Sequence, residues 1–304
     1  MPTRRWHPPR WNSSASGVLR PSDTSSSVSI SSSLTYLQIK EKALAIRDLY
    51  SQHSVALPAN CGLAELIANA IEVSDHWTLG RQEQISNERL FQMAQMDRIA
   101  EAMDPLREMA DCGAYLEHMT GGNLNPFKRE RTKSKHTLWE LELLNTLRRG
   151  SLSAVLEEPD VVVELDGSKI GIACKKFYST RHVQNVLSTG VAQIESAFEF
   201  GILAVNLDDL LPPDVVIRAP NHDALGQLLN NANFDFLRTH ERHFRRYLST
   251  GRLIGALVSM GGLADVFQDS PRLQTARQAT VWVIPGLSPE KERVIHLLRD
   301  RMMN

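Results

Sequence analysis

The feature that most constrains the fold of this chain is a pair of alternating apolar segments, residues 161–165 and 168–176, joined by Asp166-Gly167. Asp-Gly is the dipeptide that best suits a two-residue type I′ turn between antiparallel strands. With the turn placed there, the register is fixed and Val163 faces Ile170. The sequence therefore predicts an antiparallel β-hairpin.

This register gives the hairpin two different faces, because successive side chains of a strand point to opposite sides. The apolar face comprises Val161, Val163, Leu165, Ile170, Ile172 and Cys174, which makes Cys174 a core residue rather than a nucleophile. The other face comprises Asp160, Glu164, Lys169, Ala173 and Lys175. On it Asp160 and Lys175 become diagonal neighbours, with backbones within roughly 7–8 Å. The plain alternative to a functional pair is a surface ion pair worth ~0–1 kcal/mol.

A helix is predicted before the hairpin, in "TLWELELLNTLRRG", ending at Gly150. Leu143, Leu144 and Leu147 follow Glu140 at helical spacing, so Glu140 lies within the apolar stripe. A carboxylate on a buried stripe must be neutralised or paired, because an uncompensated charge there costs several kcal/mol. A metal ion or a lysine would serve, and a structural ion pair is the alternative.

The order of these features resembles the PD-(D/E)xK superfamily, the restriction-endonuclease-like nucleases, over roughly residues 138–206. Glu140 matches the first motif, Pro159-Asp160 the "PD", and Lys175 the lysine. The resemblance implies that Asp160 and a second carboxylate hold Mg²⁺ or Mn²⁺ while Lys175 orients or activates water. Such a metal stabilises charge on the phosphate and lowers the pKa of bound water. The implied activity is hydrolysis of phosphodiester bonds in nucleic acid, DNA more than RNA.

The second acidic position of the motif is Ala173, which cannot bind a cation. Some members of the superfamily supply the missing carboxylate from the following helix, where Glu195 is the candidate, and Glu140 is the other. Gln193 resembles a glutamine that some members carry on that helix. The predicted metal ligands are therefore Asp160, Glu195 and Glu140. The alternative is a catalytically degenerate module that binds nucleic acid or protein.

The chain divides into three predicted parts. Residues 1–33 are Ser-rich, with arginines and only one acid, and are predicted to be a disordered tail. Residues 34–122 have helical periodicity and form a small all-helical domain. Residues 123–304 alternate strands and helices, which predicts an α/β domain with a restriction-endonuclease-like mixed central sheet flanked by helices.

Two basic segments are candidates for contact with nucleic-acid backbone. The first, with one lysine of the hairpin, comprises Lys128, Arg129, Arg131, Lys133, Lys135 and Lys176. The second, in residues 234–248, comprises Arg238, His240, Arg242, His243, Arg245 and Arg246. A solvated linker and an ordinary amphipathic helix are the alternatives. The pair His240 and His243 has helical spacing for a metal but no visible third ligand.

Composition limits the partners that the chain can have. A net charge of −1 over 304 residues gives no whole-molecule attraction to nucleic acid, so any basic surface must be local. No apolar run approaches the ~18 residues of a membrane span, which predicts no membrane partner. The three cysteines lack any C-x-x-C spacing, which fits a reducing compartment and a cytoplasmic location. A homodimer is possible, and nothing identifies a partner of the helical domain.

Overall fold

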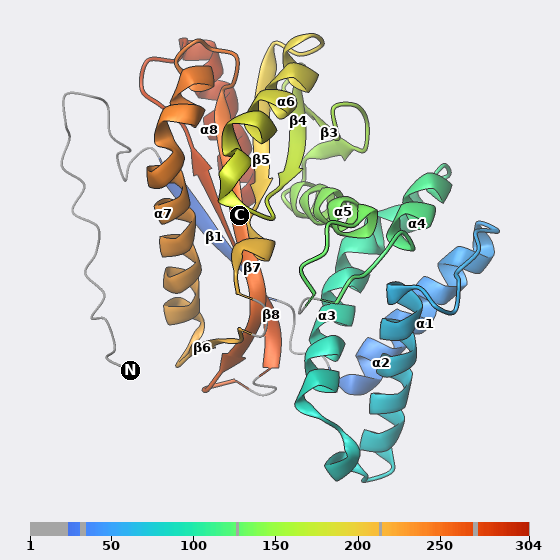
Figure 1. Ribbon diagram of the computed structural model, residues 1–304. Helices are drawn as coiled ribbons and strands as arrows, with labels where there is room; N and C mark the ends of the chain where they lie inside the picture. The colour runs from blue at the N-terminus through green and yellow to red at the C-terminus, as the bar shows by residue number, and fades with distance from the viewer. Residues whose placement is uncertain (1–23, 31–34, 126–127, 213–214, 270–272, 304) are drawn as a thin grey trace.

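The computed structural model describes residues 24–30, 35–125, 128–212, 215–269 and 273–303. Within these ranges the chain forms an α/β structure with an N-terminal helical region, as the sequence predicts (Figure 1). The part of the tail at residues 1–23, and residues 31–34, lie outside the description.

The helical region is a bundle with its own core. It comprises α1 (Tyr36–Gln52), α2 (Gly62–Thr78), η2 (Gln82–Gln84), α3 (Asn87–Met103), η3 (Asp104–Glu108) and α4 (Gly113–Met119). Helix α1 starts at a capping box, in which Thr35 and Gln38 satisfy each other's backbone N–H groups. Ile46, Leu63 and Ile99 are almost fully buried between α1, α2 and α3.

The second part is built on a mixed sheet. Its strands are β1 (Thr24–Ile30), β2 (Ser153–Val155), β3 (Val161–Leu165), β4 (Ser168–Lys176), β5 (Phe200–Asn206), β6 (Ile217–Ala219), β7 (Gly255–Val266) and β8 (Leu273–Trp282). The order across the sheet is β1-β8-β7-β5-β4-β3-β2, and β6 pairs with β7. Strands β4, β5 and β7 are mutually parallel, whereas β3 and β8 run antiparallel to their neighbours. The carboxyl ends of β4 and β5 therefore lie at the same edge.

Helices cover both faces of this sheet (Figure 1). One face packs against α5 (Lys133–Arg149) and α8 (Pro289–Met303), and the other against α6 (Val183–Glu195) and α7 (His222–Leu248). Short turns η4 (Thr180–His182) and η5 (Asp208–Leu210) follow β4 and β5. The predicted class, a mixed central sheet flanked by helices after a helical region, is confirmed at this level.

The hairpin forms in the predicted register. Val163 pairs with Ile170, and the turn residues Asp166 and Gly167 have φ of 49° and 77°. All six side chains of the predicted apolar face lie in the core under α5 and α8. Ala173 points the other way, into the core under α6 and α7. The alternation of the sequence therefore determined both the pairing and the two faces.

Helix α5 belongs to both parts of the molecule, and it lies between the bundle and the sheet in Figure 1. Leu138 and Leu141 pack in the core of the bundle, whereas Leu143, Leu144 and Leu147 pack in the core of the sheet. The helical bundle and the sheet therefore share one helix.

One stretch of the predicted disordered tail is a strand. Residues Thr24–Ile30 form β1 and pair antiparallel with the edge of β8. The structure therefore has a strand where the composition predicts disorder. The prediction rested on composition, whereas an edge strand is held by backbone hydrogen bonds that need no apolar side chain.

Candidate active site

The hairpin brings Asp160 and Lys175 together at the end away from its turn. Lys175 Nζ lies 3.3 Å from Asp160 Oδ2, and the backbone N–H of Cys174 donates to the same oxygen at 2.6 Å. The lysine chain passes close to α6 at Gly190, where an added Cβ would lie 3.2 Å from Lys175 Cε. The Lys175 side chain thus lies between Asp160 and helix α6.

Glu140 reaches this pair from α5. Burial and the charge of Asp160 raise the pKa of Glu140 to about 8, against the opposing charge of Lys175. Burial also raises the pKa of Asp160, and Lys175 offsets part of that effect. The three side chains therefore form one electrostatic cluster, in which Glu140 holds a proton near neutral pH.

Glu195 lies elsewhere. It is the last residue of α6 and forms an ion pair with Arg252, at the level where β5 begins with Phe200. Lys175 is level with Val205, five residues further along β5, which is roughly 17 Å at about 3.3 Å per residue. Glu195 as the second metal-binding carboxylate is therefore not supported, because the helix runs back along the strands before reaching it.

Two further polar side chains, Gln193 and His136, lie on α6 and α5, the helices that flank the cluster. Gln193 is half-buried, three residues after Gly190 on α6, and its Oε1 has no hydrogen-bond partner among the described residues. His136 precedes Glu140 by one helical turn on α5, and its ring lies 5.7 Å from that of Tyr178. Burial, together with the charges of Arg131, Lys176 and Lys175, lowers the pKa of His136 to about 4. The sequence analysis missed His136, although its spacing of four residues from Glu140 was a usable signal.

The donor set suits a cation held by few protein ligands. Within the described residues, no group of three or more His, Cys, Asp or Glu side chains is placed to hold a metal ion. Glu140 and Asp160 supply two carboxylates, and Ala173 supplies none. Mg²⁺ is commonly bound by one or two carboxylates, with water and substrate phosphates as the other ligands. Asp160 and Glu140, the latter once it has lost its proton, are the carboxylates of the cluster that could hold such an ion.

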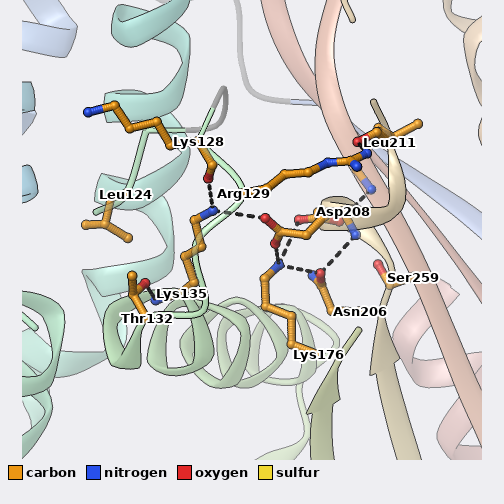
Figure 2. Close-up of polar contacts among 12 residues, drawn as sticks. Leu124, Lys128, Arg129, Thr132, Lys135, Lys176, Asn206, Asp208, Leu211 and Ser259 are labelled. Carbon is orange, nitrogen blue, oxygen red and sulfur yellow. Dashed lines mark hydrogen bonds and ion pairs between the residues drawn. The ribbon is translucent and has the colours of Figure 1, made fainter. Parts of the chain in front are cut away.

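A second group of charges lies where the bundle meets the carboxyl ends of β4 and β5. This junction cluster comprises Arg98, Lys135, Glu142, Lys176, Asn206, Asp208, Asp209 and Arg277. Lys176 Nζ contacts Asn206 Oδ1 at 2.6 Å and Asp209 at 2.8 Å (Figure 2). Lys135 Nζ lies 2.9 Å from Asp209. These residues come from different elements, and no spacing in the sequence indicates their association.

Asp208 is the centre of the junction cluster. It lies 2.7 Å from Arg98 and 2.6 Å from Arg277, and it accepts a hydrogen bond from the backbone of Gly261 at 2.8 Å. Burial alone would raise the pKa of Asp208, but Arg277, Arg98 and Lys176 outweigh burial and lower it. Arg98 belongs to α3 and Arg277 to β8, so Asp208 connects the bundle to the sheet electrostatically.

The junction cluster changes the predicted nucleic-acid surface. Lys135 and Lys176 are only 7% and 8% exposed and are ion-paired with Asp209, so they do not form part of an exposed surface for nucleic-acid backbone. Arg129 is exposed but donates to the carbonyl groups of Leu210 and Leu211. The remaining predicted residues of this segment, Lys128, Arg131 and Lys133, are exposed.

The second basic segment lies on α7. Arg238 and Arg245 pair with acids on the same helix, Asp235 and Glu241. The His240 ring packs against Phe236 in a tilted arrangement with ring centroids 4.8 Å apart, and it stacks on His243 with centroids 6.3 Å apart. These contacts account for four of the segment's basic side chains without a ligand.

The pKa of Glu140 leads to a stability prediction. An acid with pKa 4.5 when unfolded and about 8 when folded makes the folded state less stable as pH rises through that window. Glu140→Gln removes the ionisable group. We expect the variant to exceed wild type in free energy of unfolding by ~2–4 kcal/mol at about pH 9, with little difference at about pH 5. Urea unfolding in EDTA measures this.

The matched control is Glu164→Gln, on the exposed face of β3. It makes the same chemical change in the hairpin and is expected to leave the pH dependence of wild type unchanged. A Glu140→Gln protein that follows the wild-type pH profile would mean that Glu140 ionises normally and is well solvated.

Comparisons with known protein families, with curated proteins and with solved structures give no match for this chain. None of the helices within the described residues has the length and apolar character needed to span a membrane. The class of protein is therefore argued from the fold and the site alone.

Proposed function

We propose that this protein is a metal-dependent nuclease that hydrolyses phosphodiester bonds of nucleic acid, DNA in preference to RNA. The observation that carries the proposal is the contact of Asp160 with Lys175 beside a largely buried Glu140. The order of a helix with Glu140, a hairpin with Asp160 and Lys175, and a following helix is the order of the PD-(D/E)xK resemblance. A restriction-endonuclease-like fold is part of the same proposal.

Each residue has a role that its position supports. Asp160 and Glu140 would hold Mg²⁺ or Mn²⁺, which when bound supplies charge stabilisation at the phosphate and a more acidic water. Lys175 has a fixed place beside Asp160, from which its ammonium group can orient a water molecule and neutralise charge on a phosphate oxygen. The buried N–H contact from Cys174 keeps the Asp160 carboxylate aimed at the same place.

The exposed basic side chains lie on α5, the helix of Glu140, or just before it. Lys133 lowers the pKa of Glu140 through its charge, so it lies on the side of α5 that faces the cluster. Lys128 and Arg131 precede α5 and are exposed. These three cations would hold the phosphate backbone beside the reacting bond, with an affinity that falls as salt rises. A cytoplasmic location and a homodimer belong to the proposal and have no structural support of their own.

Cleavage of plasmid DNA tests the proposal. Wild type with Mg²⁺ or Mn²⁺ is expected to convert supercoiled plasmid to nicked or linear forms, and EDTA is expected to stop the reaction. Lys175→Ala should lower the rate about 100-fold, the low end for loss of a positioned proton-handling or charged group.

Lys169→Ala is the matched control, because Lys169 is exposed on the same face of β4, near the turn. It is expected to cleave at the wild-type rate. Equal rates for wild type and Lys175→Ala would assign the cleavage to a contaminant or to another site.

Ala173 favours one alternative, a degenerate module that binds nucleic acid without cutting it. Ala173 is fully buried and contributes no ligand where the superfamily has an acid. Binding of DNA or RNA without cleavage of any form, with either metal, would support this second function.

A further inference from the structure

A small cavity lies beyond the carboxyl ends of β4 and β5, beneath the bundle. It is lined by Gln95, Arg129 and members of the junction cluster, and its volume is about 60 Å³. That is room for a few water molecules or one small ion, and too little for a nucleoside. The carboxyl edge of parallel strands is where α/β sheets commonly bind ligands.

Two buried side-chain amides, those of Asn206 and Gln95, line this cavity. In each of them one polar atom has no hydrogen-bond partner among the described residues. Asn206 is fully buried, and its Oδ1 accepts from Lys176 Nζ and from the backbone of Asp208, which leaves Nδ2 without a partner among the described residues. Gln95 is 3% exposed and donates to the carbonyl of Leu124, which leaves Oε1 likewise unpaired. Buried polar groups without partners are uncommon and call for an occupant.

The charges around the cavity do not balance. The largely buried cations that line it, Arg98, Lys135 and Lys176, are matched by the carboxylates Glu142, Asp208 and Asp209, and the exposed Arg129 lies at its edge. Arg277, which pairs with Glu142 and Asp208, adds a further positive charge. Excess charge of one sign is costly in a poorly solvated site, so the surroundings favour an anion.

Taken together, the size, charge and free amide atoms define the ligand. We propose that this cavity binds a small protonated oxyanion, either inorganic phosphate or the terminal phosphate of a larger molecule. Asn206 Nδ2 would donate to a phosphate oxygen, and Gln95 Oε1 would accept from the P–OH group. Sulfate has the same shape but no such proton near neutral pH. The site is separate from the Asp160–Lys175 pair. Lys176 lines the cavity, and its side chain leaves β4 on the face opposite to that of Lys175.

Arg129 lies at the exposed side of the cavity, which leads to a binding test. Its side chain bridges to the carbonyl groups of Leu210 and Leu211 (Figure 2). In calorimetric titrations with EDTA and no nucleic acid, wild type is expected to bind inorganic phosphate at least tenfold more tightly than sulfate. Arg129→Gln should weaken phosphate binding about tenfold. Arg131→Gln, an exposed neighbour outside the cavity lining, should change it less than twofold.

Gln95→Met distinguishes a binding role of Gln95 from a structural one, because it tests the preference of the site for phosphate over sulfate. It keeps the size of the side chain but removes the acceptor, so phosphate should lose its preference over sulfate. If that variant does not fold, two measurements still test the proposal. They are the affinity of wild type for phosphate relative to sulfate, and the comparison of Arg129→Gln with Arg131→Gln. An oligonucleotide with a 5′-phosphate that binds more tightly than its 5′-hydroxyl form, with Arg129→Gln abolishing the difference, would identify a terminal phosphate as the source.

Three results would overturn the proposal. These are no detectable binding of phosphate at about 10 mM, equal affinity for phosphate and sulfate in wild type, or equal effects of Arg129→Gln and Arg131→Gln. Because no cleavage is measured, these outcomes are independent of whether the protein is a nuclease.

Discussion

Replacing Asp160 with Asn is expected to lower Mg²⁺-dependent cleavage of DNA at least ~10³-fold, which corresponds to about 4 kcal/mol of transition-state stabilisation. Asn keeps the shape of the side chain and can still accept from the N–H of Cys174 at its oxygen. It loses the negative charge that holds Lys175 and that a cation needs. The rate should fall without loss of the hairpin.

Asp166→Asn is the matched control for this variant. It makes the same chemical change in the same hairpin, at an exposed turn position whose φ of 49° Asn adopts readily. Cleavage of supercoiled plasmid by the two variants and wild type, each checked by circular dichroism, gives the comparison. If Asp160→Asn and Asp166→Asn cleave equally well, Asp160 has no part in the chemistry.

Replacing Asp208 with Asn is expected to lower the free energy of unfolding by about 3–5 kcal/mol, the cost of removing one partner from a buried ion network. Asp208 is 11% exposed, and its loss would leave Arg98 and Arg277 facing Glu142 alone. Two arginines would then share one carboxylate, which leaves one positive charge uncompensated at the contact between α3 and the sheet. Denaturant unfolding at neutral pH measures the change.

The effect should depend on pH in a defined direction. Because the pKa of Asp208 is lowered in the folded protein, its stabilisation is complete above the unfolded-state pKa of about 3.9 and is lost as pH falls below it. Asp75→Asn, at a surface ion pair with Lys40 where Asp75 is 51% exposed, serves as the control. It should cost at most ~1 kcal/mol. Equal losses at the two positions would mean that the junction cluster is solvated and contributes little.

The hairpin shows how far local sequence rules reach. Asp166-Gly167 sets the turn, and strict alternation of apolar and polar residues assigns each side chain to a face. Those two rules suffice to place Asp160 near Lys175, because both residues belong to one continuous element. The inward position of Glu140 follows in the same way from helical periodicity on α5.

The charged residues show where local rules stop. Residues 128–135 form one basic run in the sequence, yet Lys135 is buried against Asp209 while Lys128, Arg131 and Lys133 stay exposed. Glu195 is predicted from the sequence to be the second metal-binding carboxylate, yet it pairs with Arg252. In both cases the partner lies more than fifty residues away, and only chain packing decides which charges meet.

The sequence by itself determined the hairpin, its register, the apolar faces and the class of the fold, since these depend on backbone periodicity and on neighbours a few residues apart. Only the tertiary structure decided which carboxylates approach Lys175, which lysines are buried, and that a charged cavity forms under the bundle. Coulombic contacts and desolvation depend on distances in space, and residues such as Arg98, Asp208 and Arg277 are brought together by three different elements.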